Sequence, residues 1–252
     1  MLLLTDIGNT NITIALYGKS GVEQTLRLST PAGEADAQEY TSILRSRFGS
    51  YLKQPLSGAV ICSVVPQVTA AIKTCIRECF AIESIEVNAA LKTGLVFQIT
   101  APHLLGSDRI ATATGARSLY DGNLIILDFG TATTICALTA MGMYTGGAIM
   151  PGIGMSAASL QQGTAQLPAV DLSRPFTVPG KDTSENIRAG ILLGQAGAVE
   201  KISSRIKSGM RGDTRIIMTG GHCGLMKEIL SVDVVTPNLI FEGMKVIYEL
   251  NS

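Results

Sequence analysis

The chain has 252 residues, with 20 acidic and 20 basic side chains and only 5% aromatic residues. This length allows two domains of about 100–150 residues, each with an aliphatic core. The zero net charge and the scarcity of aromatic rings exclude the basic, base-stacking surfaces of nucleic-acid-binding proteins, so we expect no nucleic acid partner.

Neither a secretion signal nor a membrane span is expected. Met1–Leu4 is too short for the apolar core of a signal peptide and runs directly into Asp6. No segment reaches the roughly 18 uncharged apolar residues of a membrane span. The five cysteines are an odd number and lie mostly in apolar runs, which is typical of buried, reduced thiols. We therefore expect a cytoplasmic protein without a membrane partner.

In the first half of the chain, hydrophobic periodicity and turn residues predict the element order βββαβαβα. The predicted elements are strands Leu2–Asp6, Ile12–Tyr17 and Glu23–Ser29, helix Ala35–Phe48, strand Gly58–Val65, helix Pro66–Phe80, strand Ser84–Val87 and helix Asp108–Leu119.

The second half predicts a similar order, with one additional long helix. The predicted elements are strands Leu124–Asp128, Thr133–Thr139 and Met143–Ala148, helices Met155–Gln162 and Thr183–Lys207, strand Arg215–Thr219, helix Leu225–Leu230, strand Asp233–Thr236 and helix Leu239–Leu250. We therefore predict an α/β protein made of two related domains, 1–120 and 121–252, with the last helix, 239–250, able to pack back on the first domain.

One stretch of sequence occurs in both halves. The N-terminal MLLLTDIGNTNITIAL matches NLIILDFGTATTICAL, which begins at Asn123. Without gaps, the matched pairs are Asp6 with Asp128, Gly8 with Gly130, Ala15 with Ala137 and Leu16 with Leu138. Each stretch predicts an apolar strand, an Asp-x-Gly turn with small polar residues, and a second apolar strand.

Such a hairpin suits a phosphate group, because glycine lets the backbone N–H groups of the turn approach it closely. The aspartate at the strand end can hold Mg²⁺, which usually keeps several waters and binds through one or two carboxylates. Either turn alone is also typical of an ordinary hairpin. Two such hairpins, each with an aspartate at the strand end, favour a polyphosphate held between two domains.

A third feature is the sequence RIIMTGGH, in which a strand ends in Thr219-Gly220-Gly221 before a helix. A backbone without Cβ atoms can lie flat against a nucleoside there, although a simple strand-to-helix turn would have the same sequence. The two hairpins and this turn, in this order, resemble the ATPase core of actin, hexokinase-like sugar kinases and Hsp70. That resemblance implies the actin-like, ribonuclease H-like fold for both domains.

Six motifs, in order, resemble those of type III pantothenate kinases, and the resemblance extends from residue 1 to about 248. They are DIGNTN at Asp6–Asn11, SVVP at Ser63–Pro66, KTGL at Lys92–Leu95, GSDR at Gly106–Arg109, DFGTATT at Asp128–Thr134 and GGAIMPG at Gly146–Gly152. The resemblance implies transfer of the ATP γ-phosphoryl group to pantothenate, the first step of coenzyme A biosynthesis. It also implies Mg²⁺, a monovalent cation (K⁺ or NH₄⁺) and a homodimer.

The resemblance also implies roles for individual residues. Asp108 takes the position of the general base, and Asp128 that of a monovalent-cation ligand. Asp6 is expected to hold Mg²⁺ through a water molecule. Thr183 is expected to reach pantothenate from the partner subunit, although Asp108 and Thr183 could each simply cap a helix. The expected ATP contacts are Asp6, Ile7, Gly8, Asn9, Thr10, Asn11, Ile12, Thr13 and Thr131, and the expected substrate contacts are Gly106, Ser107, Asp108, Arg109 and Thr183.

The chain departs from the family pattern at two positions. Ile99 stands where the family usually has a tyrosine that contacts pantothenate, and Ser107 stands where it has alanine. Two alternatives therefore stay open: a kinase of another small hydroxy compound, and a non-catalytic nucleotide-binding regulator. The three aspartates Asp6, Asp108 and Asp128 argue against the regulator, because a binding module needs no base.

Overall fold

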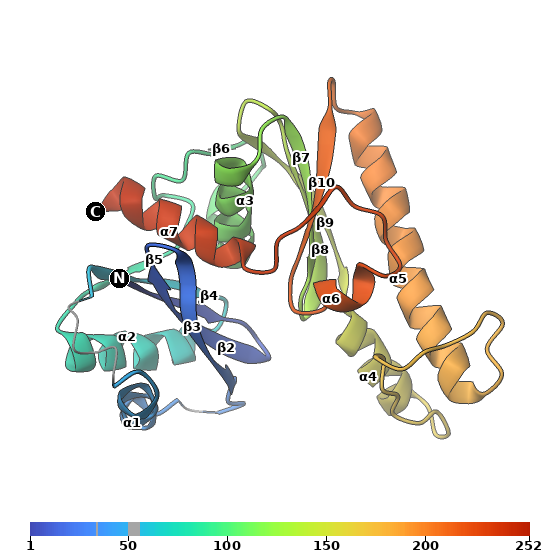
Figure 1. The fold of residues 1–252 in the computed structure, drawn as a ribbon, viewed down its shortest axis with the longest axis horizontal. Coiled ribbons are helices and arrows are strands. Elements are labelled where there is room, and N and C mark those ends of the chain that lie inside the picture. The colour runs from blue at the N-terminus through green and yellow to red at the C-terminus, as the bar shows by residue number, and fades with distance from the viewer. Residues whose placement is uncertain (34, 50–55) are drawn as a thin grey trace. The chain divides into compact units, whose positions relative to one another are not determined.

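The computed structural model describes residues 1–33, 35–49 and 56–252. These residues form two compact units (Figure 1). The first unit contains Met1–Leu119 together with Asn238–Ser252, and the second contains Tyr120–Pro237. The helix at the end of the chain thus belongs to the first unit, although it follows the second half in sequence.

The first unit is a five-stranded sheet with helices on both faces. Its elements are β1 (Leu2–Ile7), β2 (Asn11–Gly18), β3 (Gly21–Ser29), α1 (Ala37–Phe48), β4 (Gly58–Ser63), α2 (Pro66–Phe80), β5 (Ser84–Glu86), β6 (Val96–Phe97), the 3-10 helix η2 (Pro102–Leu104), α3 (Ser107–Leu119) and α7 (Leu239–Asn251). The sheet order is β3-β2-β1-β4-β5, with β1 antiparallel to β2 and parallel to β4. Helices α1 and α2 cover one face, and α3 and α7 pack together on the other (Figure 1).

The core of the first unit follows from the alternation of side chains along its strands. Leu3, Ile14 and Ile61 are fully buried and pack against apolar residues of α1 and α2, including Leu44 and Ile72. Burying such aliphatic side chains contributes about 1.5–3 kcal/mol each. This core fixes the strand ends that carry the candidate site.

The second unit is built on the same plan. Its elements are β7 (Asn123–Phe129), β8 (Ala132–Leu138), β9 (Met143–Pro151), α4 (Ile153–Gly163), α5 (Thr183–Ser208), β10 (Thr214–Thr219), α6 (Cys223–Met226) and β11 (Val234–Val235). The strands run in the order β9-β8-β7-β10-β11, which repeats the order of the first sheet element by element. The long helix α5 packs on β7 and β8, and α4 packs on α5.

The register of the two hairpins corrects the ungapped sequence match. Asp6 pairs with Thr13, seven residues later, whereas Asp128 pairs with Thr134, six residues later. The second turn is therefore one residue shorter, and Ala137 corresponds to Leu16 rather than to Ala15. A one-residue shift moves every side chain of the return strand to the opposite face, so sequence identity there does not indicate structural equivalence.

Irregularities in the sheets support the corrected alignment. A register shift lies between Leu16 and Tyr17 in the pairing of β2 with β3, and another lies between Ala137 and Leu138 in the pairing of β8 with β9. These positions correspond once the shorter turn is taken into account. The repeat is therefore present in the structure as well as in the sequence.

Some predicted elements differ from the observed ones. The predicted helix Leu225–Leu230 is wrong in extent, because α6 begins at Cys223 and ends at Met226. The short elements β6 and η2 were not predicted, since two or three residues are too few to produce a detectable periodicity. No helix in the described part of the chain is long and apolar enough to cross a membrane.

Candidate functional site

The first hairpin forms a tight, backbone-rich turn after Asp6. The Gly8 N–H donates to the Asn11 carbonyl at 2.9 Å. Thr30, which follows β3, closes the turn from the side: its hydroxyl donates to the Gly8 carbonyl at 2.7 Å, and its N–H donates to the Thr10 carbonyl at 3.0 Å. Asp6 itself is half-buried at the end of β1. The turn is thus held in one shape beside the carboxylate.

The candidate base lies in the first turn of α3. Asp108 is half-buried, and its Oδ1 accepts the N–H of Arg109 at 2.8 Å. A Cβ atom on Gly106 would collide with this carboxylate oxygen, so the glycine leaves room for the carboxylate to fold back over the helix start in this rotamer. The capping alternative for Asp108 is wrong, because α3 begins at Ser107 and Asp108 is the second residue of the helix rather than the residue before it. Its other oxygen, Oδ2, makes no hydrogen bond to the described residues.

The structure connects the first hairpin with the start of α3 through the end of β4. The hydroxyl of Ser107 bonds both backbone groups of Ser63, and the N–H of Val64 donates to the Ile7 carbonyl at 3.1 Å. Asp6 and Asp108 are thus attached to neighbouring backbone in the same unit.

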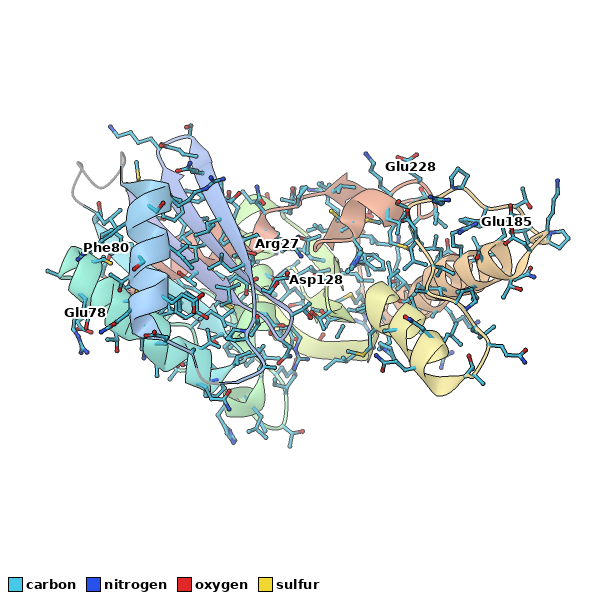
Figure 2. All side chains as sticks on the ribbon, turned by 90° about the horizontal axis from the view of Figure 1, so that it is seen from below. Arg27, Glu78, Phe80, Asp128, Glu185 and Glu228 are labelled. Atoms are coloured by element: carbon cyan, nitrogen blue, oxygen red, sulfur yellow. The ribbon has the colours of Figure 1, made fainter. Side chains whose placement is uncertain are left out.

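The second hairpin places Asp128 at the end of β7 (Figure 2). Its turn is closed by the Gly130 N–H, which donates to the Ala132 carbonyl at 3.1 Å. Gly220 follows the neighbouring strand β10 with a φ of +93°, and a Cβ there would collide with the Asp128 carboxylate and with the backbone of Phe129. The Gly-Gly turn predicted to face a nucleoside therefore packs directly against the second aspartate.

Two further features surround the second hairpin. Gly152, just before α4, lies so close to the carbonyls of Gly130 and Thr131 that no side chain would fit. Cys223 is buried behind the turn, and burial raises the pKa of its thiol, with the charge of Asp128 acting in the same direction. The thiol is therefore neutral near pH 7.

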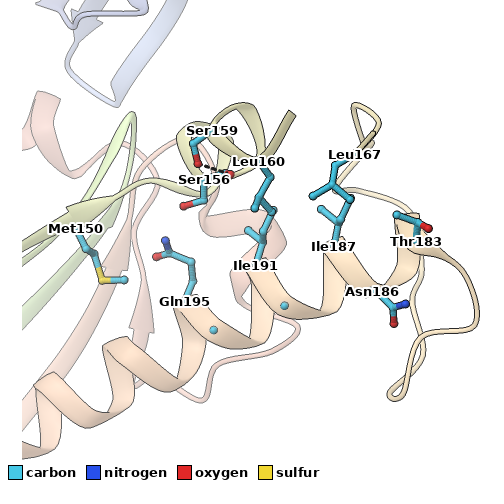
Figure 3. A pocket seen from close by; sticks show the side chains of 12 residues that line it. Met150, Ser156, Ser159, Leu160, Leu167, Thr183, Asn186, Ile187, Ile191 and Gln195 are labelled. Atoms are coloured by element: carbon cyan, nitrogen blue, oxygen red, sulfur yellow. Dashed lines mark hydrogen bonds between the residues drawn. The ribbon is translucent and has the colours of Figure 1, made fainter. Parts of the chain in front are cut away.

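Thr183 begins α5 and lines a cavity of about 580 Å³ in the second unit (Figure 3). It does not cap the helix, because the side chain of Asp182 accepts the Glu185 N–H at 2.8 Å. The capping alternative for Thr183 is therefore wrong, and its side chain is exposed. The cavity lies between α4 and α5 and is lined mainly by Met150, Leu160, Leu167, Ile187, Ile191 and Gln195.

Among the described residues, no three His, Cys, Asp or Glu side chains form a group that could hold a metal ion. The available donors fit a hydrated Mg²⁺, which needs only one or two carboxylates when phosphate oxygens and waters supply the rest. Asp6 is half-buried at the strand end and fits such a role. Asp128 likewise offers a carboxylate at the end of a strand, an oxygen donor that suits a hard cation.

Sequence reasoning missed two features of this site. The cavity beside Thr183 depends on the packing of two helices, and no local pattern indicates it. The hydrogen bonds of Ser107 join residues 44 positions apart, and the only signal for them was the departure from the family's alanine.

Ile99, which stands where the family usually has a tyrosine, is half-buried in the segment between β6 and η2.

Comparison with known proteins gives a consistent result. A family model described as type III pantothenate kinase matches residues 2–205. The chain is 40% identical to the type III pantothenate kinase of Roseiflexus sp. strain RS-1, over 100% of this chain and 99% of that protein. It is 35% identical to the one from Dehalococcoides mccartyi, over 100% of this chain and 98% of that protein.

Among solved structures, the activator of the 2-hydroxyisocaproyl-CoA dehydratase from Clostridium difficile, with bound ADPNP, aligns with a TM-score of 0.56 at 12% identity. The alignment covers 99% of this chain and 95% of that chain. A structural match at such low sequence identity supports a shared fold and nothing about function. The predicted α/β fold of the actin-like ATPase and sugar-kinase superfamily is confirmed.

Proposed function

Because this chain belongs to the type III pantothenate kinase family, it phosphorylates pantothenate with ATP in coenzyme A biosynthesis, and we propose that Asp108 is the general base. In this reaction the pantothenate hydroxyl oxygen forms a bond to the γ-phosphorus of ATP, the bond from that phosphorus to the bridging oxygen of ADP breaks, and the hydroxyl proton passes to the carboxylate. The observation that carries the proposal is the geometry of Asp108. Its Oδ1 is held by the Arg109 N–H, while Oδ2 makes no hydrogen bond to the described residues.

The neighbouring residues suit this role. Arg109, the next residue in the chain, carries a guanidinium group, and such a group binds carboxylate or phosphate oxygens in a bidentate manner. Gly106 leaves room for the base to turn over the helix start. Phosphoryl transfer depends mainly on positioning and charge stabilisation, so a fixed carboxylate and a nearby cation are the groups it requires.

We propose further that the two hairpins hold the phosphates of ATP. Asp6–Thr13 and Thr131 supply turn N–H groups and small polar side chains, which approach a phosphate closely. Asp6 would hold Mg²⁺ through water, and Asp128 would hold a monovalent cation, K⁺ or NH₄⁺. When bound, Mg²⁺ neutralises charge on the phosphate oxygens.

The proposed homodimer rests on the exposed face of α5. Gly190 and Gly194, one helical turn apart, are exposed, and a Cβ on either would meet no described atom within 4 Å. Together with the exposed Leu193 and the apolar cavity, they form a surface suited to close approach of a second copy. Thr183 lies on the rim of this cavity (Figure 3), from which it could contact pantothenate bound to the partner.

Mixed dimers test the role of Thr183. Chains with Asp108→Asn and chains with Thr183→Ala, each weak alone, should regain activity when refolded together, because one site then has both residues. Heterodimers confirmed by mass but with no gain in activity would remove Thr183 from the partner's site.

Ile99 is the reason to consider a substrate other than pantothenate. Isoleucine offers no hydroxyl to pantothenate, and one hydrogen bond contributes about 0.5–1.5 kcal/mol. We propose that pantothenate is still the substrate but binds more weakly than in relatives with tyrosine. Ile99→Tyr should lower the KM for pantothenate a few-fold, and a protein that ignores pantothenate with either residue would favour another small hydroxy compound.

The base proposal is tested with a coupled assay of ADP release with and without pantothenate. Asp108→Asn should lower kcat by at least about 10²-fold, as loss of a general base does, while the KM for ATP stays near that of the wild type. Asp36→Asn is the matched control, because Asp36 is a helix-capping carboxylate of α1 to which the proposal assigns no part in catalysis. Wild-type turnover in a folded Asp108→Asn protein would remove Asp108 from the mechanism.

The cysteines indicate the cellular compartment of the protein. All five cysteines are free thiols, and four of them are buried. Free thiols in this number are typical of a reducing compartment, so we propose the cytoplasm.

A further inference from the structure

Ser107, the residue before the candidate base, has a hydroxyl that is fully engaged inside the protein. It donates to the Ser63 carbonyl at 2.7 Å and accepts the Ser63 N–H at 2.9 Å. It also accepts the thiol of Cys62 at 3.4 Å. A serine hydroxyl has one donor and two acceptor positions, so all three are in use. The side chain is 7% exposed and has no hydrogen-bonding capacity left for a substrate.

Further hydrogen bonds hold Ser63, whose backbone Ser107 binds, and the residue after it. The Ser63 hydroxyl accepts the Val65 N–H at 3.0 Å and the Thr69 hydroxyl at 2.6 Å, which closes the turn between β4 and α2. The next N–H, that of Val64, donates to the Ile7 carbonyl in the strand that carries Asp6. The end of β4 therefore forms a rigid support that also holds the start of the first phosphate hairpin.

We propose that Ser107 is a positioning residue, which fixes the first turn of α3 to the end of β4 and so holds Asp108 in register with the first phosphate hairpin. This inference rests on the proposed role of Asp108 as the base. Loose placement of a reacting group is costly, because a misplacement of about 1 Å can lower the rate by roughly 10²-fold.

The test is steady-state kinetics of Ser107→Ala. We expect kcat to fall roughly 10-fold, in line with the loss of the two hydrogen bonds to the Ser63 backbone, and the KM for ATP to change less than about 2-fold. Ser107→Thr keeps a hydroxyl on the same carbon and should recover most of the lost kcat. Ser203→Ala is the matched control, because Ser203 is a buried serine whose hydroxyl has no hydrogen-bond partner in the described residues, and it should keep wild-type kinetics.

A double-mutant cycle separates positioning from a general loss of structure. If Ser107 acts through Asp108, adding Ser107→Ala to Asp108→Asn should lower kcat no further. A full additional 10-fold loss on that background would overturn the inference, as would a wild-type kcat for Ser107→Ala. Should Ser107→Ala fail to fold by circular dichroism, Ser107→Cys, with a weak donor and acceptor of similar size, is measured in the same cycle against the same criteria.

The two proposals can fail separately. Asp108→Asn alone decides whether Asp108 is the base, because it leaves Ser107 and its partners unchanged. The comparison of Ser107→Ala in the two backgrounds decides whether Ser107 positions it.

Discussion

The two Asp-x-Gly hairpins share one plan but are closed in different ways. In the first, the side chain and N–H of Thr30 bond the turn carbonyls, and the last residue of β4 is Ser63, which binds Ser107. In the second, glycines take both places. Gly152 follows β9 and packs on the turn carbonyls, and Gly220 follows β10 and packs on Asp128.

This difference shows how a repeated element can acquire two tasks. The first hairpin is held by hydrogen bonds from side chains, which leave its turn accessible to a ligand. The second is held by backbone contact at positions where no Cβ fits, so its aspartate is enclosed more tightly by backbone. A hydrated divalent ion suits the first arrangement, and a monovalent ion among carbonyl groups suits the second.

Gly220→Ala should break the second hairpin and leave the first intact. The new Cβ would meet Asp128 and Phe129 at a φ of +93°, so we expect a destabilisation of about 2–3 kcal/mol, typical of such strain, and a large loss of activity. Denaturant unfolding and kcat are the measurements. Gly221→Ala is the control, since a Cβ there meets no described atom within 4 Å and φ is not positive. Equal stability of the two variants would mean that the close packing of Gly220 has no energetic role.

Asp6→Asn and Asp128→Asn should separate the two ion requirements. We expect Asp6→Asn to raise the Mg²⁺ concentration for half-maximal activity by roughly 10- to 100-fold, as loss of a metal-site carboxylate does, with the K⁺ requirement unchanged. Asp128→Asn should raise the K⁺ requirement and leave the Mg²⁺ requirement unchanged. Activity titrations with each ion, and with Na⁺ in place of K⁺, are the measurements. Both variants shifting the same ion would contradict the division of tasks.

Thr30→Val should loosen the first hairpin slightly. The change keeps the side-chain shape but removes the hydroxyl that binds the Gly8 carbonyl, at a cost of about 1 kcal/mol. We expect the KM for ATP to rise a few-fold with kcat nearly unchanged. Thr25→Val, at an exposed position on the preceding strand β3, is the control. An unchanged KM for ATP in Thr30→Val would show that this hydroxyl does not shape the phosphate turn.

Much of the fold was predictable because its signals are local. Apolar strands such as Leu2–Ile7 and Asn123–Phe129, and the glycines after each aspartate, produce patterns that a single sequence displays. The family motifs then placed Asp6, Asp108 and Asp128 at strand and helix ends, where the structure has them. The short elements β6 and η2 gave too little pattern to be predicted.

The sequence by itself determined the order of the elements along the chain, the three aspartates and the glycines that let backbone approach them, because these depend on residues close together in the chain. Only the tertiary structure decided the register of the second hairpin, where the turn is one residue shorter than the ungapped match implies. It also decided that Ser107 bonds Ser63 and that Gly220 packs on Asp128. These contacts join residues far apart in sequence, and their geometry depends on how whole strands and helices pack, which no local pattern of side chains specifies.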